Sequence, residues 1–278
     1  MIIDTHMHAC SSGAAPFPLL PSSPPPAQDF DGTIEGLSAA MAACGVDAAV
    51  LVQWSSRHGH DNSYASHGAV TRPAQFAGVC TVDLDAAEAA DCLSRWATTG
   101  AMRGVRLFNG FPTPGRDDMT RVDDPKSRIV IERSQSLGIP VHVMSAPAGL
   151  DAVIAVARDY PEVDLIIDHL AMADDPEILL SLAGFANVSL KYSSGVIVTR
   201  QGLKPSAEGL AHERHLMGSL VRKFGPDRLM WGSDYPQTRQ PYADLVDLGM
   251  AVLHGLDASE QQLILGGNAR RRWPALCP

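Results

Sequence analysis

The stretch "IPVHVMSAPAGLDAVIAVARDYPEVDLIID" (residues 139–168) contains the unit on which the fold prediction rests. Its two ends, IPVHVM (139–144) and VDLIID (163–168), are short apolar runs typical of buried strands. The segment between them, about 149–159, has the apolar spacing of a helix. A strand, a helix and a second strand in this order indicate a βαβ unit with parallel strands.

The same unit recurs along the whole chain. Six further strand-like runs are MIIDT (1–5), AAVLVQ (48–53), FAGVCTV (76–82), RGVRLF (103–108), NVSLKY (187–192) and RLMWGS (228–233). The other helix-like segments are about 33–44, 63–73, 85–99, 125–137, 175–185, 208–224, 241–255 and 258–272. Eight such repeats predict an α/β fold, a single-domain (β/α)8 TIM barrel over residues 1–278. An open doubly wound sheet is the alternative, but no glycine-rich fingerprint follows the first strand.

Composition narrows the classes of function. The chain has 278 residues, a formal net charge of −9 and 45% hydrophobic residues, which is typical of a globular protein. No apolar run approaches the roughly 20 residues that span a bilayer, and the start lacks the basic region of a secretory signal. We therefore expect a cytoplasmic protein without a membrane partner. Because no basic cluster stands out, we also expect no nucleic-acid partner.

The cysteines point away from a sulfur-based site. There are five, an odd number, and none of them forms a CxxC pair. This pattern argues against a disulfide framework and against a cysteine-ligated zinc site.

Three connections between a strand and the following helix are long or irregular. They are residues 9–32, 109–124 and 193–207. Each follows the carboxyl end of a strand, which is the active-site face of a barrel. We expect these loops to cover or shape a binding site.

Polar residues stand at the carboxyl ends of the predicted strands. They are His6, His8, Gln53, Arg106, His142, His169, Lys191 and Asp234. In a barrel these ends converge, so the set predicts one active site. His6 and His8, two residues apart, share one face of a strand and can hold a metal or a substrate oxygen, or simply be polar residues near a terminus. Histidines on loops and helices, such as His58, are expected to have no chemical role.

The remaining strand-end residues are candidates for substrate binding. We expect Arg106 and Lys191 to bind a substrate carboxylate or hydroxyl, since arginine suits planar, bidentate recognition. Gln53 and His142 are expected to contact substrate as well. The structural alternatives are that Arg106 bridges two strands and that Lys191 reaches solvent. By strand alternation, Asp168 is expected to point to the opposite face from its neighbour and to be a structural partner.

Five ordered motifs carry a family resemblance. They are DTHMH (4–8), VRLF (105–108), IIDHLA (166–171), NVSLKYSSG (187–195) and LMWGSDYP (229–236). Together they resemble the amidohydrolase-2 family of metal-dependent TIM-barrel hydrolases. The resemblance is greatest to the lactonase branch with L-fuconolactonase and 2-pyrone-4,6-dicarboxylate lactonase, and it covers nearly the whole chain. It implies a (β/α)8 fold and a hydrolase that opens a small lactone, of a sugar or of a carboxylated ring, or acts on a related cyclic or carboxylate substrate. Asp234 would be the general base.

The resemblance leaves the cofactor open. Metal-dependent members usually end the fifth strand in a histidine, whereas this chain has Met144 there and His142 two residues earlier. The ligand set that remains is His6, His8, His169 and Asp234. These nitrogen and carboxylate groups could hold one divalent cation, with zinc the best suited. Because some members of the lactonase branch work without metal, the alternative is that the three histidines polarise the lactone carbonyl directly.

Two other functions compete with lactone hydrolysis. One is a metal-dependent decarboxylase or hydratase of an aromatic or unsaturated carboxylic acid, whose relatives usually carry the histidine that Met144 replaces here. The other is a barrel that binds without catalysis, which would be expected to have lost the histidine pair or the base. We therefore favour a lactonase with a small-molecule substrate, and the sequence is compatible with a homo-oligomer.

Overall fold

Eight parallel strands form the core of the computed structural model, which describes residues 1–23, 31–99, 102–111, 120–173 and 176–277. The strands are β1 (Ile3–Met7), β2 (Ala48–Val52), β3 (Phe76–Cys80), β4 (Met102–Asn109), β5 (Val141–Ser145), β6 (Leu165–Asp168), β7 (Val188–Ser193) and β8 (Leu229–Gly232). Their order in the sheet is their order in the chain. The ends of β1 and β8 meet where the N–H of Asp234 donates to the His6 carbonyl at 2.8 Å and that of His8 to Tyr235 at 2.9 Å. The predicted (β/α)8 barrel is confirmed.

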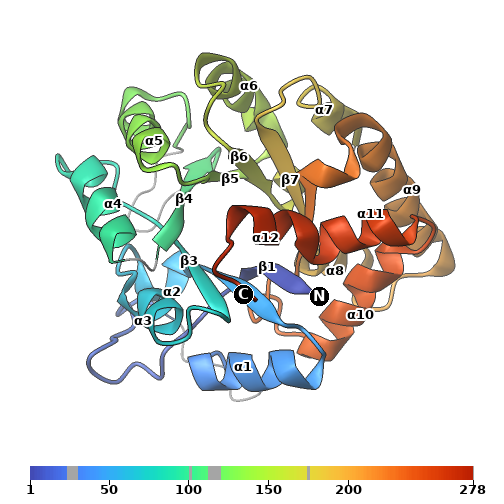
Figure 1. Cartoon of the computed structure of the whole chain (residues 1–278), viewed down its shortest axis with the longest axis horizontal. Helices are drawn as coiled ribbons and strands as arrows, with labels where there is room; N and C mark the ends of the chain where they lie inside the picture. The colour runs from blue at the N-terminus through green and yellow to red at the C-terminus, as the bar shows by residue number, and fades with distance from the viewer. Residues whose placement is uncertain (24–30, 100–101, 112–119, 174–175, 278) are drawn as a thin grey trace.

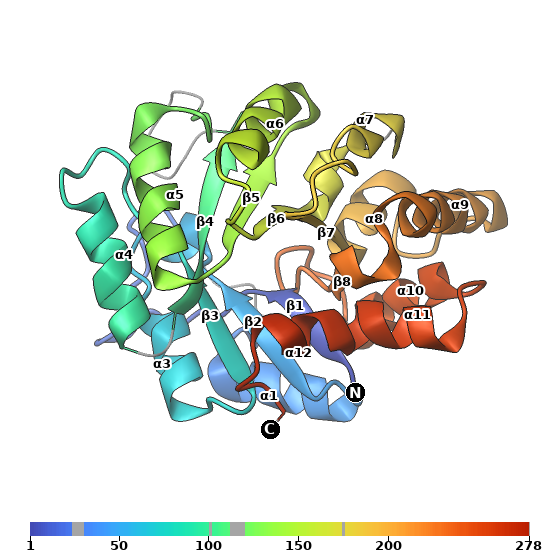
Figure 2. The ribbon, with the colours of Figure 1, turned by 45° about the horizontal axis from the view of Figure 1, so that its top comes forward.

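Helices surround the barrel (Figures 1 and 2). They are α1 (Ile34–Ala43), α3 (Ser63–Thr71), α4 (Ala89–Thr98), α5 (Pro125–Leu137), α6 (Leu150–Asp159), α7 (Pro176–Leu180), α9 (Ala207–Phe224) and α10 (Tyr242–Leu253). Shorter elements are α2 (Ser55–His58), α8 (Ser194–Gln201), α11 (Ala258–Gln262), the π-helical turn η4 (Leu263–Gly267) and α12 (Asn268–Arg272). Within the described ranges, no helix is long and apolar enough to cross a membrane.

Local sequence fixes where each element begins and ends, as α5 illustrates. The Asp124 side chain accepts a hydrogen bond from the N–H of Lys126, and Pro125 occupies the first turn. Both features favour a helix start, because they leave fewer backbone donors unpaired. Gly138, with φ of 64°, ends the helix in the left-handed conformation that glycine adopts without strain. The chain can therefore turn directly into β5.

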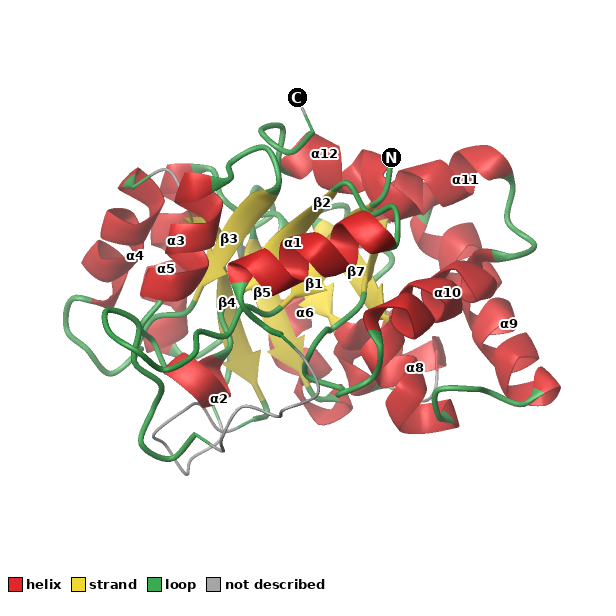
Figure 3. Cartoon of the chain, turned by 90° about the horizontal axis from the view of Figure 1, so that it is seen from below, coloured by secondary structure: helices red, strands yellow, loops and turns green. Residues whose placement is uncertain are grey.

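The amino-terminal end of the barrel is closed by apolar side chains, and we call it the floor. The interior cluster that begins there and extends along the strands comprises Ile3, Ala48, Val50, Val52, Ala77, Val79, Ile166, Met230, Ala269, Trp273 and Leu276. In Figure 1, α12 crosses the middle of the ring of strands. Figure 3 shows both termini and α12 at one end of the strands, with α2 and α8 at the other. The opposite, carboxyl-terminal end, which we call the mouth, is therefore left for a binding site.

The three connections predicted to be loops differ in structure. Most of 193–207 forms α8, because the Ser193 side chain accepts from the Val196 N–H and starts a helix there, so the loop prediction is wrong for this segment. In the first connection, Leu20 N–H donates to the carbonyl of Arg57, which ties 9–23 to α2. Residues 24–30 and 112–119 of the other two predicted loops lie outside the described residues.

Candidate active site

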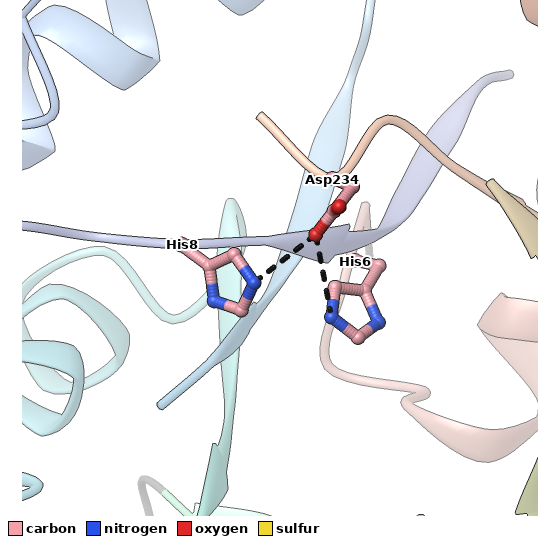
Figure 4. Close-up of side chains that lie close together, drawn as sticks. All are labelled: His6, His8 and Asp234. Carbon is pink, nitrogen blue, oxygen red and sulfur yellow. Dashed lines mark hydrogen bonds and ion pairs between the residues drawn. The ribbon is translucent and has the colours of Figure 1, made fainter. Parts of the chain in front are cut away.

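Three histidines surround one carboxylate oxygen at the mouth, and Figure 4 shows two of them, His6 and His8, with Asp234. Oδ1 of Asp234 lies 3.2 Å from Nε2 of His8 and 3.9 Å from Nε2 of His6. Nε2 of His169 is also 3.9 Å from this oxygen. All four side chains are buried, and they come from β1 and from the residues that follow β1, β6 and β8. The structure thus brings together four of the predicted residues.

An unusual backbone conformation aims Asp234 into the site. Its φ is 64°, in the left-handed region that aspartate tolerates better than most residues. A close approach of α8 requires a glycine beside it: a Cβ on Gly195 would lie 2.7 Å from Oδ2 of Asp234. Gly232 is similarly constrained, since a Cβ there would lie 2.7 Å from the Cβ of His6.

A second backbone feature brings both Asp168 and His169 to the interior of the barrel. β6 ends at Asp168, and the next four residues, His169 to Met172, have φ between 51° and 56°. Strand alternation therefore stops before His169, and the two neighbours do not point to opposite faces. The expectation that Asp168 faces away from its neighbour is wrong: its carboxylate is 0% exposed and lies 3.5 Å from Nδ1 of His6. Such a run of left-handed residues is strained, which is common at functional sites.

Contacts at the Nδ1 atoms restrict how the histidines are protonated. Nδ1 of His8 is 2.7 Å from the Val52 carbonyl, which only accepts, so this nitrogen carries a hydrogen. Nδ1 of His169 is 2.7 Å from the Ser193 hydroxyl. The pattern, in which Nδ1 is held by the protein and Nε2 faces the centre, is the usual one for histidines that bind a metal.

The charge state of the site follows from burial and neighbours. Burial raises the pKa of Asp234, but the neighbouring His169, His8 and Arg106 together hold it below its ordinary value. Burial lowers the pKa of His169 and, more strongly, that of His6. At neutral pH the site therefore contains an ionised carboxylate and neutral imidazoles at these two positions.

The donor set fits a divalent cation. Ligand atoms of His6, His8 and Asp234 all lie within 4.8 Å of one another. Neither ring nitrogen of His6 has a hydrogen-bond partner in the described part of the chain, although the residue is 0% exposed. Zinc takes nitrogen and oxygen ligands at about 2.0–2.2 Å, which puts neighbouring tetrahedral ligands about 3.4 Å apart. Three protein ligands that leave a position open are typical of a catalytic metal centre.

Lys191 and His142, both predicted to contact substrate, lie deeper in the barrel. Each is 0% exposed, and Nζ of Lys191 is 3.1 Å from Nδ1 of His142 and 3.3 Å from Oδ1 of Asp168. The His142 ring also lies 5.9 Å from that of Trp273 at the floor. These side chains form a layer between the floor and the histidine centre, and they bond to one another rather than face the mouth.

Arg106 and Gln53 lie closer to the mouth. Arg106 donates through Nη2 to the Gln53 carbonyl at 2.8 Å and to the Ser55 hydroxyl at 3.3 Å, so it does bridge two strands. Its Nε has no partner, and no carboxylate lies within 4.0 Å among the residues that the structure describes. Gln53 uses its amide to hold the following loop, donating to the carbonyls of Gly59 and Asp61.

Sequence reasoning missed two neighbours of the histidines. Trp54 stacks on His8 with ring centroids 5.6 Å apart and an interplanar angle of 26°. Its position directly after a predicted strand was the available signal. Ser193 contacts His169, and its place in the SSG motif was a weaker signal. Met144, partly exposed at the end of β5, provides no nitrogen ligand.

Fold and site together define the class of protein: a barrel enzyme with a histidine and aspartate centre at the carboxyl ends of its strands. The family model described as Amidohydrolase matches residues 3–275, and the chain belongs to this family.

Relatives with described activities include two hydrolases. An L-fucono-1,5-lactonase from Burkholderia ambifaria is 28% identical over 213 residues, which is 74% of this chain and 70% of the relative. A structure described as a 2-pyrone-4,6-dicarboxylic acid hydrolase from Pseudomonas putida is 27% identical, with a TM-score of 0.75, and the match covers 99% of this chain and 97% of that one. An amidohydrolase from Burkholderia multivorans, solved with bound zinc, shares the fold at 23% identity and a TM-score of 0.76, with 99% of both chains covered.

Proposed function

We propose that this protein is a hydrolase that opens a small lactone, of a sugar or of a carboxylated ring. The observation that carries the proposal is the ionised Asp234 oxygen with three Nε2 atoms within 3.2–3.9 Å of it. Such a centre can both accept a proton and stabilise charge on a carbonyl oxygen. The relatives named as an L-fucono-1,5-lactonase and as a 2-pyrone-4,6-dicarboxylic acid hydrolase support the same reaction class.

Asp234 serves as the general base in this mechanism. It takes a proton from a water molecule, whose oxygen attacks the carbonyl carbon of the lactone. When the ring C–O bond breaks, the proton passes from Asp234 to the leaving alkoxide, which gives a hydroxy acid. The lowered pKa of Asp234 keeps it ionised and ready to accept a proton near neutral pH.

Two of the histidines are placed to hold a cation near the carbonyl oxygen that becomes negative. We propose that His6, His8 and Asp234 hold one divalent cation, with zinc the best match to the ligand types. When bound, the cation would act as a Lewis acid toward the lactone carbonyl. His169 lies beside the carboxylate and orients it, with Ser193 holding the far side of its ring.

Arg106 supports a substrate that carries a carboxylate. A buried guanidinium without a counter-ion is unfavourable, because burial removes its hydration. Arg106 is only 7% exposed and retains an unpartnered Nε–H. An anionic group on the lactone would complete the pairing, since guanidinium and carboxylate match in shape and charge.

A substrate panel tests the proposal. We expect hydrolysis of at least one member of a set of sugar lactones and dicarboxylate lactones, followed by proton release, with loss of activity after chelation and recovery with zinc. Elemental analysis of the chelated protein checks that metal is absent. Activity that survives in metal-free protein would remove the cation from the mechanism. No turnover of any lactone, together with release of CO2 from an aromatic or unsaturated carboxylic acid, would replace the proposal with a decarboxylase.

A further inference from the structure

Three buried polar side chains beneath His6 have no part in the mechanism above. Lys191, Asp168 and His142 are each 0% exposed. A buried ammonium and a buried carboxylate are costly unless they pair well, so a role beyond packing is expected for them. Their place directly between the floor and the histidine centre suggests that the role concerns His6.

The Lys191 ammonium determines which atoms donate and which accept in the hydrogen bonds of this layer. An ammonium only donates, and Nζ is 3.1 Å from Nδ1 of His142, so that nitrogen is the acceptor. The same ammonium lies 3.3 Å from Oδ1 of Asp168. Lys191 therefore donates in two directions and is held between an imidazole and a carboxylate.

Asp168 in turn determines which ring nitrogen of His6 carries the hydrogen. Its Oδ1 is 3.5 Å from Nδ1 of His6, and an ionised carboxylate can only accept. The same oxygen is 3.3 Å from the buried Lys191 ammonium, and a buried ammonium requires an ionised partner of this kind. The distance is longer than a well-formed hydrogen bond, and such contacts commonly tighten when a ligand arrives.

The position of this hydrogen determines what Nε2, on the opposite side of the His6 ring, can bind. With its hydrogen on Nδ1, His6 presents the lone pair of Nε2 to the Asp234 oxygen, 3.9 Å away. A lone pair and a carboxylate repel each other unless a positive centre lies between them. The arrangement therefore suits His6 as a cation ligand and not as a donor to the lactone oxygen.

We propose that Asp168, held in place by Lys191, is a positioning residue that fixes the hydrogen of His6 on Nδ1 and so makes Nε2 a cation ligand. This inference rests on the part of the proposed function in which His6 helps to hold a cation. It extends the site from the histidine centre down to the middle of the barrel.

The test uses two measurements that need no substrate. Nitrogen-15 NMR of the full chain, labelled at histidine and free of metal, locates the hydrogen of the His6 ring. Competition with a chromophoric chelator gives the zinc affinity. We expect the wild type to carry the hydrogen on Nδ1. We expect Asp168→Leu with Lys191→Met to lose this preference and to bind zinc about 10- to 100-fold more weakly.

A matched double variant controls for the loss of an ion pair. Asp164 and Arg272 form a bridge of 2.7 Å at the floor end of β6, and Asp164→Leu with Arg272→Met should leave zinc affinity and the His6 hydrogen unchanged. Removing both partners avoids an uncompensated buried charge, which favours folding of the test variant.

Two results would overturn the proposal. One is unchanged zinc affinity in the Asp168→Leu, Lys191→Met variant with the hydrogen still on Nδ1. The other is a wild-type protein with the His6 hydrogen on Nε2, which is decisive even if the variant does not fold. Because neither readout involves turnover, an inactive lactone panel would count against the proposed reaction alone.

Discussion

The two ends of the barrel differ in how completely their polar side chains are paired. At the floor, Arg272 pairs with Asp164 and also donates to Ser189 at 2.6 Å, and the indole N–H of Trp273 donates to the Arg103 carbonyl at 3.2 Å. Above the floor, some partners are missing. In the described ranges, the buried side-chain nitrogens and oxygens without a hydrogen bond belong to His6, Trp54, Arg106, His142, Asp168, Arg200 and Thr238.

This contrast indicates that the floor end of the strands contributes mainly to stability and the mouth end mainly to function. A buried polar atom without a partner costs free energy, so a fold selected for stability alone would satisfy it. The floor meets that requirement with ion pairs and an apolar plug. The mouth does not, and the unpartnered ring of His6 lies beside Asp234, as expected for a group whose partner is a ligand. Substitutions at the two ends should therefore affect different quantities.

The largest effect is expected at the mouth. Asp234→Asn removes the proton acceptor and one cation ligand, so kcat for lactone hydrolysis should fall by about 10⁴-fold while the melting temperature changes little. Steady-state kinetics and thermal unfolding of the same preparation check this. Asp164→Asn at the floor is the control and should leave kcat near the wild-type value. Near-normal turnover of Asp234→Asn would mean that another group is the base.

The matching change at the floor should act on stability. Trp273→Ala removes a side chain that is 2% exposed inside the barrel, and we expect the free energy of unfolding to fall by about 4 kcal/mol. Denaturant unfolding measures this loss, and kcat well below the melting temperature should stay within a few-fold of wild type. A large loss of kcat with unchanged stability would contradict the separation between the two ends.

The layer between the two ends should make stability depend on pH. Burial, then the charge of Lys191, lowers the pKa of His142 from 6.5 to about 4. Above pH 6.5 the His142 ring is neutral in both the folded and the unfolded chain. Between pH 6.5 and about pH 4, the ring is protonated in the unfolded chain and stays neutral in the folded chain. Stability is therefore full above pH 6.5 and lost as the pH falls through this window, by about 3 kcal/mol for this residue.

Chemical denaturation across pH 4–8 tests this dependence. His142→Gln should flatten the acid side of the profile. His254→Gln, at an exposed position, should leave it unchanged. An identical slope in wild type and His142→Gln would show that other groups account for the acid sensitivity.

The sequence predicted the barrel because its periodic signals are local. Each strand is a short apolar run, and some helices carry their own start and stop residues, such as Asp124 and Gly138 around α5. The residues around Asp234 were also predictable, because strand ends converge in a barrel whatever the loops do. That part of the site follows from topology alone.

Other parts of the site depend on the tertiary structure. The left-handed conformation of His169 has no glycine to signal it, so the inward direction of Asp168 could not be read from alternation. α8 was missed because its sequence, SGVIVTRQ, combines a glycine with β-branched residues that favour helices weakly. Lys191 was expected at the mouth, and only the three-dimensional pairing with Asp168 shows that it lies beneath.

The smallest effect is expected for Ser193, a residue at the mouth that contributes to both activity and stability. Ser193 has two contacts: its hydroxyl lies 2.7 Å from Nδ1 of His169, and it accepts the Val196 N–H at the start of α8. Ser193→Ala should therefore lower kcat/KM by about 10-fold through a loosened imidazole, and lower the free energy of unfolding by about 1 kcal/mol through the lost cap.

Ser206→Ala separates these two contributions. Ser206 caps α9 in the same way, accepting the N–H of Gly209 at 3.0 Å, but is not among the contacts of the histidine centre. Both variants should lose similar stability, and only Ser193→Ala should lose activity. Equal kcat/KM values in the two variants would mean that His169 keeps its orientation without the hydroxyl. The orientation of His169 would then come from packing alone.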